Sequence, residues 1–151
     1  MDQIRPWLFI GKYRDTLQLG HLKAKSIQAM LQLAEPIEQP DIISLYLPVA
    51  DVAPISHKHI RQGVDFIHEQ KQKGNRVLVA CGAGMNRSSA FSAAALKDDE
   101  GLSLFDAFKE VKRCPPESMP NEPVWISLCN YYNESTPYLK VMRLELNINE
   151  G

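Results

Sequence analysis

The sequence lacks the features that mark secreted scaffolds and membrane proteins. It holds only three cysteines, Cys81, Cys114 and Cys129, and an odd number without a regular framework argues against disulfide stapling and for a reducing compartment. No apolar run approaches the roughly 18 residues that a membrane-spanning helix needs, and the N-terminal segment MDQIRPWLFIGK has no apolar core of the signal-peptide kind. We therefore expect a cytoplasmic location and no membrane partner.

A surplus of charge of one sign is missing as well. The 17 lysines and arginines nearly balance the 18 aspartates and glutamates, so the formal net charge is −1. Without a polybasic tail we expect no nucleic-acid partner, and an anionic ligand would have to be held by local geometry. No cluster of histidine, cysteine or aspartate has the spacing of a metal site, so we also expect no metal and no cofactor.

Apolar residues make up 44% of the chain, which is enough to bury a core without disulfide bonds. A length of 151 residues predicts a single domain that spans residues 1–151. Runs rich in β-branched and other apolar residues predict strands at 7–11, 26–34, 42–49 and 76–80. The last of these runs is apolar from Val77 onwards, which is typical of a strand that is buried on both faces.

Helices alternate with these strands and then follow them. Apolar residues at helical spacing predict helices over 56–75, 87–101, 103–113 and 121–134. Ser56, Ser103 and Asn121 have the chemistry of N-caps, while Gly74 and Gly101 suit helix ends. Because the strands come early and alternate with helices, we predict an α/β fold with a central mixed sheet and helices on both of its faces.

The C-terminal segment, 136–151, carries a different pattern. Apolar residues alternate there at Met142, Leu144, Leu146 and Ile148. Alternation with a period of two is typical of a strand, so we expect this segment either to add an edge strand to the sheet or to pack as an extension.

The stretch VLVACGAGMNRSSAF joins the last predicted strand to an alanine-rich helix. A glycine loop in this position exposes backbone N–H groups, and the helix N-terminus adds a partial positive charge, so the arrangement builds an anion site. Gly82 and Gly84 suit the unusual backbone angles of such a loop. Arg87 can hold two oxygens of one phosphate, and Cys81 beside it would act as a thiolate nucleophile on phosphorus.

Taken singly, these residues have ordinary explanations. A cysteine after a buried strand is usually a small core residue, and an arginine at a helix start is usually a surface residue. The joint pattern Cys-Gly-Ala-Gly-Met-Asn-Arg-Ser between a strand and a helix favours a functional loop instead. It is not the nucleotide-binding loop, because no lysine follows the glycines.

A cysteine, five further residues, an arginine and a serine match the C-x5-R-[ST] signature, and over 3–135 the chain resembles the dual-specificity branch of the cysteine-based protein tyrosine phosphatases. The resemblance implies a protein tyrosine phosphatase-like fold. It implies that the phosphate is bound by Gly82, Ala83, Gly84, Met85, Asn86 and Arg87. The chain departs from the usual pattern at Ala80, where histidine is common, and at Asn86, where serine or glycine is common.

The resemblance also assigns catalytic roles, to Cys81, Arg87, Asp51 and Ser88. It maps the general acid onto Asp51 in LPVADVAP, for which the alternative is a turn aspartate before a proline. Asp41 precedes a predicted strand and Asp65 lies in a predicted helix, so neither is a good candidate for the general acid. Ser88 would donate a hydrogen bond to the departing thiolate in the second step, and its alternative role is that of an ordinary first-turn residue.

With these roles the resemblance implies a cysteine-dependent dual-specificity phosphatase. This hydrolase would remove phosphate from tyrosine, serine and threonine side chains of a phosphorylated protein or peptide, through a phosphocysteine intermediate. Residues 82–86 include no lysine of the kind that phosphoinositide phosphatases carry in this loop. Two alternatives stay open: a phosphatase-like binding module with weak or no turnover, and a phosphatase of RNA ends or small phosphate esters.

Overall fold

The middle strand of the central sheet ends at Cys81, and the segment between Cys81 and the helix that begins at Asn86 is the cysteine loop. The computed structural model describes residues 1–82 and 85–150, and the side chains of these residues as far as 144. The strands lie in the order β1-β2-β5-β3-β4, and their bounds are β1 (Asp2–Arg5), β2 (Leu8–Lys12), β3 (Ile27–Gln32), β4 (Ile43–Tyr46) and β5 (Arg76–Cys81). β1 is antiparallel to β2, whereas the other neighbours are parallel, so the sheet is mixed as predicted.

The central strand β5 is buried on both faces. Val77, Val79 and Cys81 belong to the larger core cluster, whereas Leu78 and Ala80 belong to a smaller one. Successive side chains of a strand point to opposite faces of its sheet, which is why this strand is apolar from Val77 to Cys81. The alternation places the thiol of Cys81 on the face that carries the larger core.

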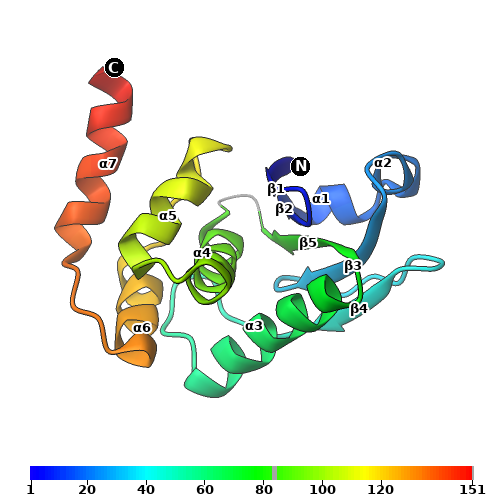
Figure 1. Cartoon of the computed structure of the whole chain (residues 1–151), viewed down its shortest axis with the longest axis horizontal. Helices are drawn as coiled ribbons and strands as arrows, with labels where there is room; N and C mark the ends of the chain where they lie inside the picture. The colour runs from blue at the N-terminus through cyan, green and yellow to red at the C-terminus, as the bar shows by residue number, and fades with distance from the viewer. Residues whose placement is uncertain (83–84, 151) are drawn as a thin grey trace.

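Helices cover both faces of the sheet, as predicted. Their bounds are α1 (Tyr13–Thr16), α2 (Leu19–Ala24), α3 (His57–Gln72), α4 (Asn86–Glu100), α5 (Leu104–Arg113), α6 (Glu122–Tyr132) and α7 (Tyr138–Glu150). Leu22 of α2 closes the smaller cluster, while α3 and α4 supply buried residues to the larger one. Figure 1 shows α2 and α3 on opposite sides of the sheet. In the described part of the chain, no helix is both long enough and apolar enough to cross a bilayer.

Side-chain caps fix the start of three predicted helices. The side chains of Ser56, Ser103 and Asn121 each accept a hydrogen bond from the backbone N–H three residues later, at 3.1, 3.1 and 3.3 Å. Each such cap contributes about 1 kcal/mol. Gly74 and Gly101 have φ values of 79° and 68° at the ends of α3 and α4, a conformation that favours glycine.

The helices α3 and α4 approach each other closely at Gly63. A β-carbon at this position would lie 2.3 Å from Cε1 and 2.5 Å from Cδ1 of Phe91 in α4. Only a residue without a side chain leaves room for the ring. This contact helps to fix the axis of α4, the helix that carries Arg87.

The edge strand that alternation suggested for the C-terminal segment is wrong. The segment forms α7, which packs on the larger core through the buried Val141 and the partly buried Tyr138 and Leu144. These three side chains are spaced by three residues, so the segment also carries a helical period. The hydroxyl of Tyr138 donates a hydrogen bond to the carbonyl of Pro120 at 2.9 Å, which ties the start of α7 to the segment that precedes α6.

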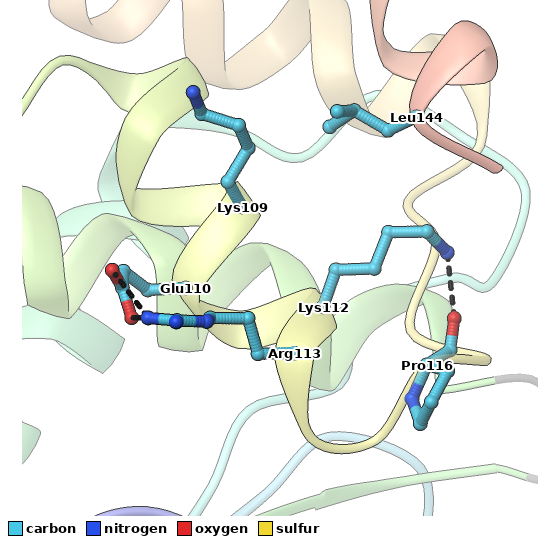
Figure 2. Close-up of a pocket in the computed structure, with 6 residues that line it drawn as sticks. All are labelled: Lys109, Glu110, Lys112, Arg113, Pro116 and Leu144. Atoms are coloured by element: carbon cyan, nitrogen blue, oxygen red, sulfur yellow. Dashed lines mark hydrogen bonds and ion pairs between the residues drawn. The ribbon is translucent and has the colours of Figure 1, made fainter. Parts of the chain in front are cut away.

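A hollow of about 560 Å³ lies between α5 and α7 (Figure 2). It is lined by Lys109, Glu110, Lys112, Arg113, Pro116 and Leu144. The buried ammonium of Lys112 donates to the carbonyls of Pro116 and Ser118, at 2.6 and 3.1 Å. These bonds hold the segment that runs from α5 towards Asn121. Among the residues that the structure describes, the lining of the hollow includes none next to Cys81 in the sequence.

Candidate active site

Cys81 ends β5, and its thiol meets the first turn of α4. The sulfur lies 3.0 Å from the hydroxyl of Ser88 and accepts the backbone N–H of the same residue at 3.3 Å. The Cys81 side chain is almost completely buried. The first turn of a helix has unpaired N–H groups and a partial positive charge, so the sulfur is placed where a negative charge is stabilised.

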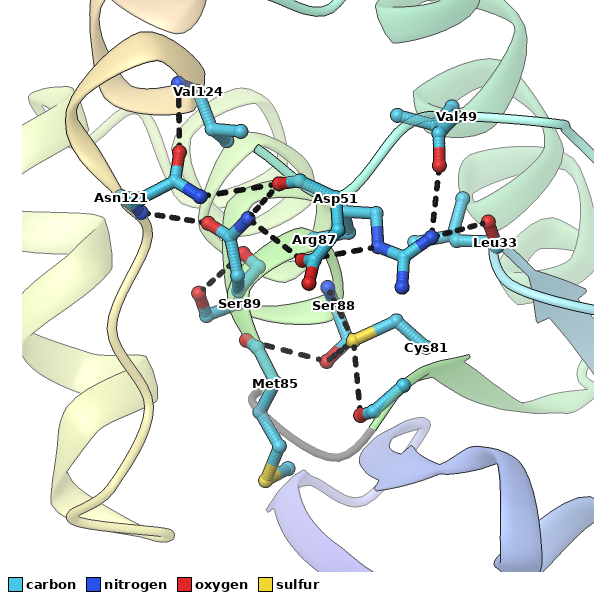
Figure 3. Close-up of polar contacts among 12 residues, drawn as sticks. Leu33, Val49, Asp51, Cys81, Met85, Arg87, Ser88, Ser89, Asn121 and Val124 are labelled. Atoms are coloured by element: carbon cyan, nitrogen blue, oxygen red, sulfur yellow. Dashed lines mark hydrogen bonds and ion pairs between the residues drawn. The ribbon is translucent and has the colours of Figure 1, made fainter. Parts of the chain in front are cut away.

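Arg87 is held by two backbone carbonyls from different segments. Its Nη1 donates to the carbonyl of Leu33, just after β3, at 3.0 Å, and to the carbonyl of Val49 at 2.8 Å (Figure 3). Within the described part of the chain its buried Nε has no hydrogen-bond partner, although Oδ1 of Asp51 lies 3.6 Å away. The guanidinium is therefore fixed in place while part of its donor edge is free for a ligand.

Asp51 lies on the loop that follows β4 and reaches the start of α4. The Asn86 side-chain amide donates to the backbone carbonyl of Asp51, and to its carboxylate at 3.1 Å. Asn121 adds a side-chain bond to the same carbonyl at 3.1 Å, and its backbone N–H donates to the Asn86 side-chain oxygen at 2.6 Å. Figure 3 shows this amide network beside Arg87. The structure thus brings Asp51 next to Asn86 and Arg87 at the start of α4, with 59% of its side chain exposed.

Two features of the loop can be given for its described residues. Gly82 does not have a positive φ, and a β-carbon there would lie 3.0 Å from Nη2 of Arg87. Met85 is left-handed, with φ 54°, and its N–H donates to the carbonyl of Gly82 at 3.4 Å. The predicted phosphate ligands Ala83 and Gly84 lie outside the described residues.

Ala80 and Asn86, at which the chain departs from the usual phosphatase pattern, have well-defined contacts in the structure. The side chain of Ala80 is 2% exposed and packs against Phe9 and Leu22, on the face of the sheet opposite to Cys81. The side chain of Asn86 bonds to the Asp51 loop and to the segment before α6, so it links three parts of the site.

Sequence reasoning missed some of the groups that build this site. Asn121 was predicted only as a helix cap, and it also bonds to Asp51. The carbonyls of Leu33 and Val49 could not be found from residue types, because every residue has one. Their only sequence signal is their place near the ends of the strands predicted over 26–34 and 42–49.

Comparison with known proteins identifies a matching family. The family model described as "Dual specificity phosphatase, catalytic domain" matches residues 8–134, which include the cysteine loop, the Asp51 loop and Asn121. The matched range therefore contains every residue of the network around Cys81.

Curated relatives carry the same description in their names. Human dual specificity protein phosphatase 15 is 32% identical over 124 residues, which are 80% of this chain and 42% of the relative. Dual specificity protein phosphatase 18 of Pongo abelii is 39% identical over 93 residues, which are 60% of this chain and 49% of the relative. The chain thus spans about half the length of these relatives or less.

Solved structures show the same architecture. Human DUSP28 superimposes with a TM-score of 0.82 at 26% identity, covering 88% of this chain and 96% of that one. The human tyrosine phosphatase-like serine/threonine/tyrosine-interacting protein superimposes with a TM-score of 0.79 at 28% identity, covering 88% and 95%. The predicted fold, from the sheet to the helices on both faces, is confirmed by these likenesses.

Proposed function

The chain belongs to the dual specificity phosphatase family, and we propose that it hydrolyses phosphate monoesters on tyrosine, serine and threonine side chains of proteins. Cys81 is the nucleophile, Arg87 and the loop N–H groups bind the phosphate, and Asp51 moves the proton. Ser88 assists the second step.

One observation carries this proposal. The sulfur of Cys81 lies at the first turn of α4, in contact with both the N–H and the hydroxyl of Ser88. The guanidinium of Arg87, on the same turn, is fixed by two carbonyls. Within the described residues its buried Nε has no hydrogen-bond partner and lies 3.6 Å from Oδ1 of Asp51. A buried cationic donor beside a sulfur at a helix N-terminus fits a tetrahedral anion that is attacked by that sulfur.

In the first step the thiolate of Cys81 attacks phosphorus. A sulfur–phosphorus bond forms, the bond from phosphorus to the ester oxygen breaks, and Asp51 gives its proton to the leaving oxygen. Arg87 and the helix terminus meet the negative charge on the other phosphate oxygens throughout, which is electrostatic stabilisation of the transition state.

In the second step water attacks the phosphocysteine. Asp51, now ionised, takes a proton from the water as the oxygen–phosphorus bond forms and the sulfur–phosphorus bond breaks. The departing sulfur of Cys81 becomes a thiolate again. The hydroxyl of Ser88, 3.0 Å from the sulfur, donates a hydrogen bond to that new charge.

The location that fits this chemistry is a reducing compartment, the cytoplasm. All three cysteines, Cys81, Cys114 and Cys129, are free thiols. A nucleophilic thiol must stay reduced to attack phosphorus, and free thiols persist in compartments buffered by glutathione and thioredoxin.

The proposal is tested by turnover. The purified chain is assayed without added metal on 4-nitrophenyl phosphate, on matched peptides with phosphotyrosine, phosphoserine or phosphothreonine, and on RNA with a 5′-phosphorylated end, with vanadate as inhibitor. Cys81→Ser should reduce turnover to background and keep tungstate binding, whereas Cys114→Ser, the same change at an exposed thiol, should keep the wild-type rate. Substantial hydrolysis by the Cys81→Ser protein would exclude the nucleophile assignment.

A second candidate function is phosphate-dependent binding with little turnover. Two observations favour this binding function. Alanine stands at position 80, where histidine is common, and one similar structure is named a phosphatase-like interacting protein. Wild-type protein that binds the phosphopeptides but hydrolyses none of them would select this candidate. Turnover of RNA ends or small esters in preference to the peptides would select a phosphatase of those substrates.

A further inference from the structure

The last helix of the chain, α7, is not part of the candidate active site. Figure 1 shows α7 beside α5 and α6, on the side of these helices that faces away from the sheet. It also lies outside residues 8–134, the range that the family model matches. The family match therefore gives α7 no part in catalysis, and an influence of α7 on the site must pass through the groups between them.

The hydroxyl of Tyr138, the first residue of α7, joins this helix to the peptide group between Pro120 and Asn121. It donates a hydrogen bond to the carbonyl of Pro120 at 2.9 Å. The N–H of the same peptide group belongs to Asn121 and donates to the side-chain oxygen of Asn86 at 2.6 Å. A peptide group is planar and stiff, so these two hydrogen bonds fix one plane from its opposite edges.

The path of hydrogen bonds continues from Asn86 to Asp51. The side-chain nitrogen of Asn86 donates to the backbone carbonyl of Asp51 and, at 3.1 Å, to its carboxylate. The side chain of Asn121 donates to the same Asp51 carbonyl at 3.1 Å. Hydrogen bonds in such a chain polarise and strengthen one another. A continuous polar path thus runs from the hydroxyl of Tyr138 to the carboxylate of Asp51.

Packing of α7 determines where the hydroxyl of Tyr138 lies. Val141, one turn further along the helix, is fully buried in the larger core. Just before α7, the carbonyl of Thr136 accepts a hydrogen bond from Nε1 of Trp125 in α6 at 2.8 Å. The start of α7 is therefore held on both sides of Tyr138. Because Pro120 is buried as well, loss of the hydroxyl removes a donor that water does not readily replace.

Resting on the proposed function, we propose that α7 positions the general acid, with Tyr138 as the positioning residue. Its hydroxyl does not touch the substrate. It fixes the peptide group of Pro120 and Asn121, which holds Asn86 and through it Asp51. With this bond in place, the Asp51 carboxylate stays where it can give its proton to the leaving oxygen. Without the bond, the Asp51 side chain, which is 59% exposed, samples more orientations and transfers its proton less often.

The test is Tyr138→Phe, which removes the hydroxyl and keeps the ring that packs on the larger core. We expect kcat on a phosphoserine peptide to fall about two- to tenfold, the range of one neutral hydrogen bond, with little change in KM. The loss on 4-nitrophenyl phosphate should be smaller, because nitrophenolate leaves with little help from an acid.

Tyr132→Phe is the matched control. Its hydroxyl donates to Oδ2 of Asp98 at 3.1 Å, at the opposite end of α6 from Asn121. Loss of this hydroxyl should leave the ratio of the two rates unchanged. An equal effect of Tyr132→Phe, or an equal loss on both substrates with Tyr138→Phe, would overturn the proposal.

A double variant tests whether Tyr138 acts through the acid. Tyr138→Phe is added to Asp51→Asn, which has no acid to position, and kcat is measured on a phosphotyrosine peptide. The phenolate of tyrosine is less basic than an alkoxide, so the double variant stays measurable. Effects of residues that act as a unit are not additive, so Tyr138→Phe should cause no further loss there. The same fold-loss in both backgrounds would reject the positioning role.

A readout without turnover separates the failure of this path from the failure of catalysis. Proton–nitrogen NMR compares the backbone amide of Asn121 and the side-chain amide of Asn86 in wild-type and Tyr138→Phe protein. Shifts at both groups, with no turnover by wild-type protein, would support the path from α7 and reject the catalytic proposal. Turnover with unchanged resonances and unchanged rates would reject the path and leave the catalytic proposal standing.

Discussion

The hydroxyl oxygen of Ser88 lies 3.0 Å from the sulfur of Cys81, across the gap between the end of β5 and the first turn of α4. Ser88 also donates its backbone N–H to the same sulfur at 3.3 Å. One residue thus supplies two donors to the sulfur, which in the proposed mechanism carries negative charge before the first step and after the second.

Replacing Ser88 by alanine should slow the second step more than the first. The backbone N–H remains, but the hydroxyl that stabilises the departing thiolate is lost, and a hydrogen bond to a charged group contributes about 1.5–3 kcal/mol, or roughly 10- to 150-fold in rate. Rapid-mixing assays with 4-nitrophenyl phosphate should show a burst of nitrophenolate followed by slow turnover. Ser92→Ala, in the same helix, is the control because its buried hydroxyl has no partner among the described residues; equal slowing there would contradict the assignment.

Replacing Asp51 by asparagine should have an effect that depends on the leaving group. Phosphoserine releases a basic alkoxide that needs a proton, and a general acid contributes about 10²- to 10⁴-fold there. Nitrophenolate leaves with little help, so its loss should be much smaller. The measurement is the wild-type to variant ratio of kcat for both substrates, and equal ratios would place the acid elsewhere.

Replacing Asn86 by alanine should resemble a weaker form of the Asp51 variant. The amide holds the Asp51 loop through the Asp51 carbonyl and carboxylate, and the loss of such bonds costs about 1–2 kcal/mol, or roughly 5- to 30-fold. We expect this loss in kcat on phosphoserine peptides, with little change in KM and less loss on 4-nitrophenyl phosphate. Asn130→Ala, at an exposed position of α6, is the matched control. A rise in KM alone would mean that Asn86 serves phosphate binding.

Replacing Gly63 by alanine should destabilise the fold. The new β-carbon would overlap the ring of Phe91, and overpacking of this kind costs about 1–3 kcal/mol, or roughly 2–12 °C in Tm for a chain of this size. At Gly20 in α2 a β-carbon would have nothing within 4 Å, so Gly20→Ala should be neutral or should stabilise by up to about 1 kcal/mol. Thermal unfolding of both variants is the measurement, and a stable Gly63→Ala protein would show that α3 and α4 can separate at low cost.

The parts of the site that are close together in sequence were predictable. A cysteine and an arginine six residues apart, with glycines between and an apolar run before, specify a strand, a loop and a helix by local preferences alone. The bonds from Asn86 to Asp51 and from Asn121 to Asn86 each join residues 35 positions apart, and residue type did not indicate them. In the C-terminal segment two periods coexist, and packing on the larger core selected the helical one.

The two hydrogen bonds that hold Arg87 tolerate substitutions at the residues that accept them. Leu33 and Val49 hold the guanidinium with carbonyl oxygens, while their side chains lie in the core. Every amino acid supplies the same carbonyl oxygen. Either residue can therefore be exchanged for another apolar one of similar volume without changing the orientation of the Arg87 guanidinium. The direction of the Arg87 guanidinium is therefore set by the path of the main chain, and a grafted segment that reproduces this path should preserve it whatever side chains it brings.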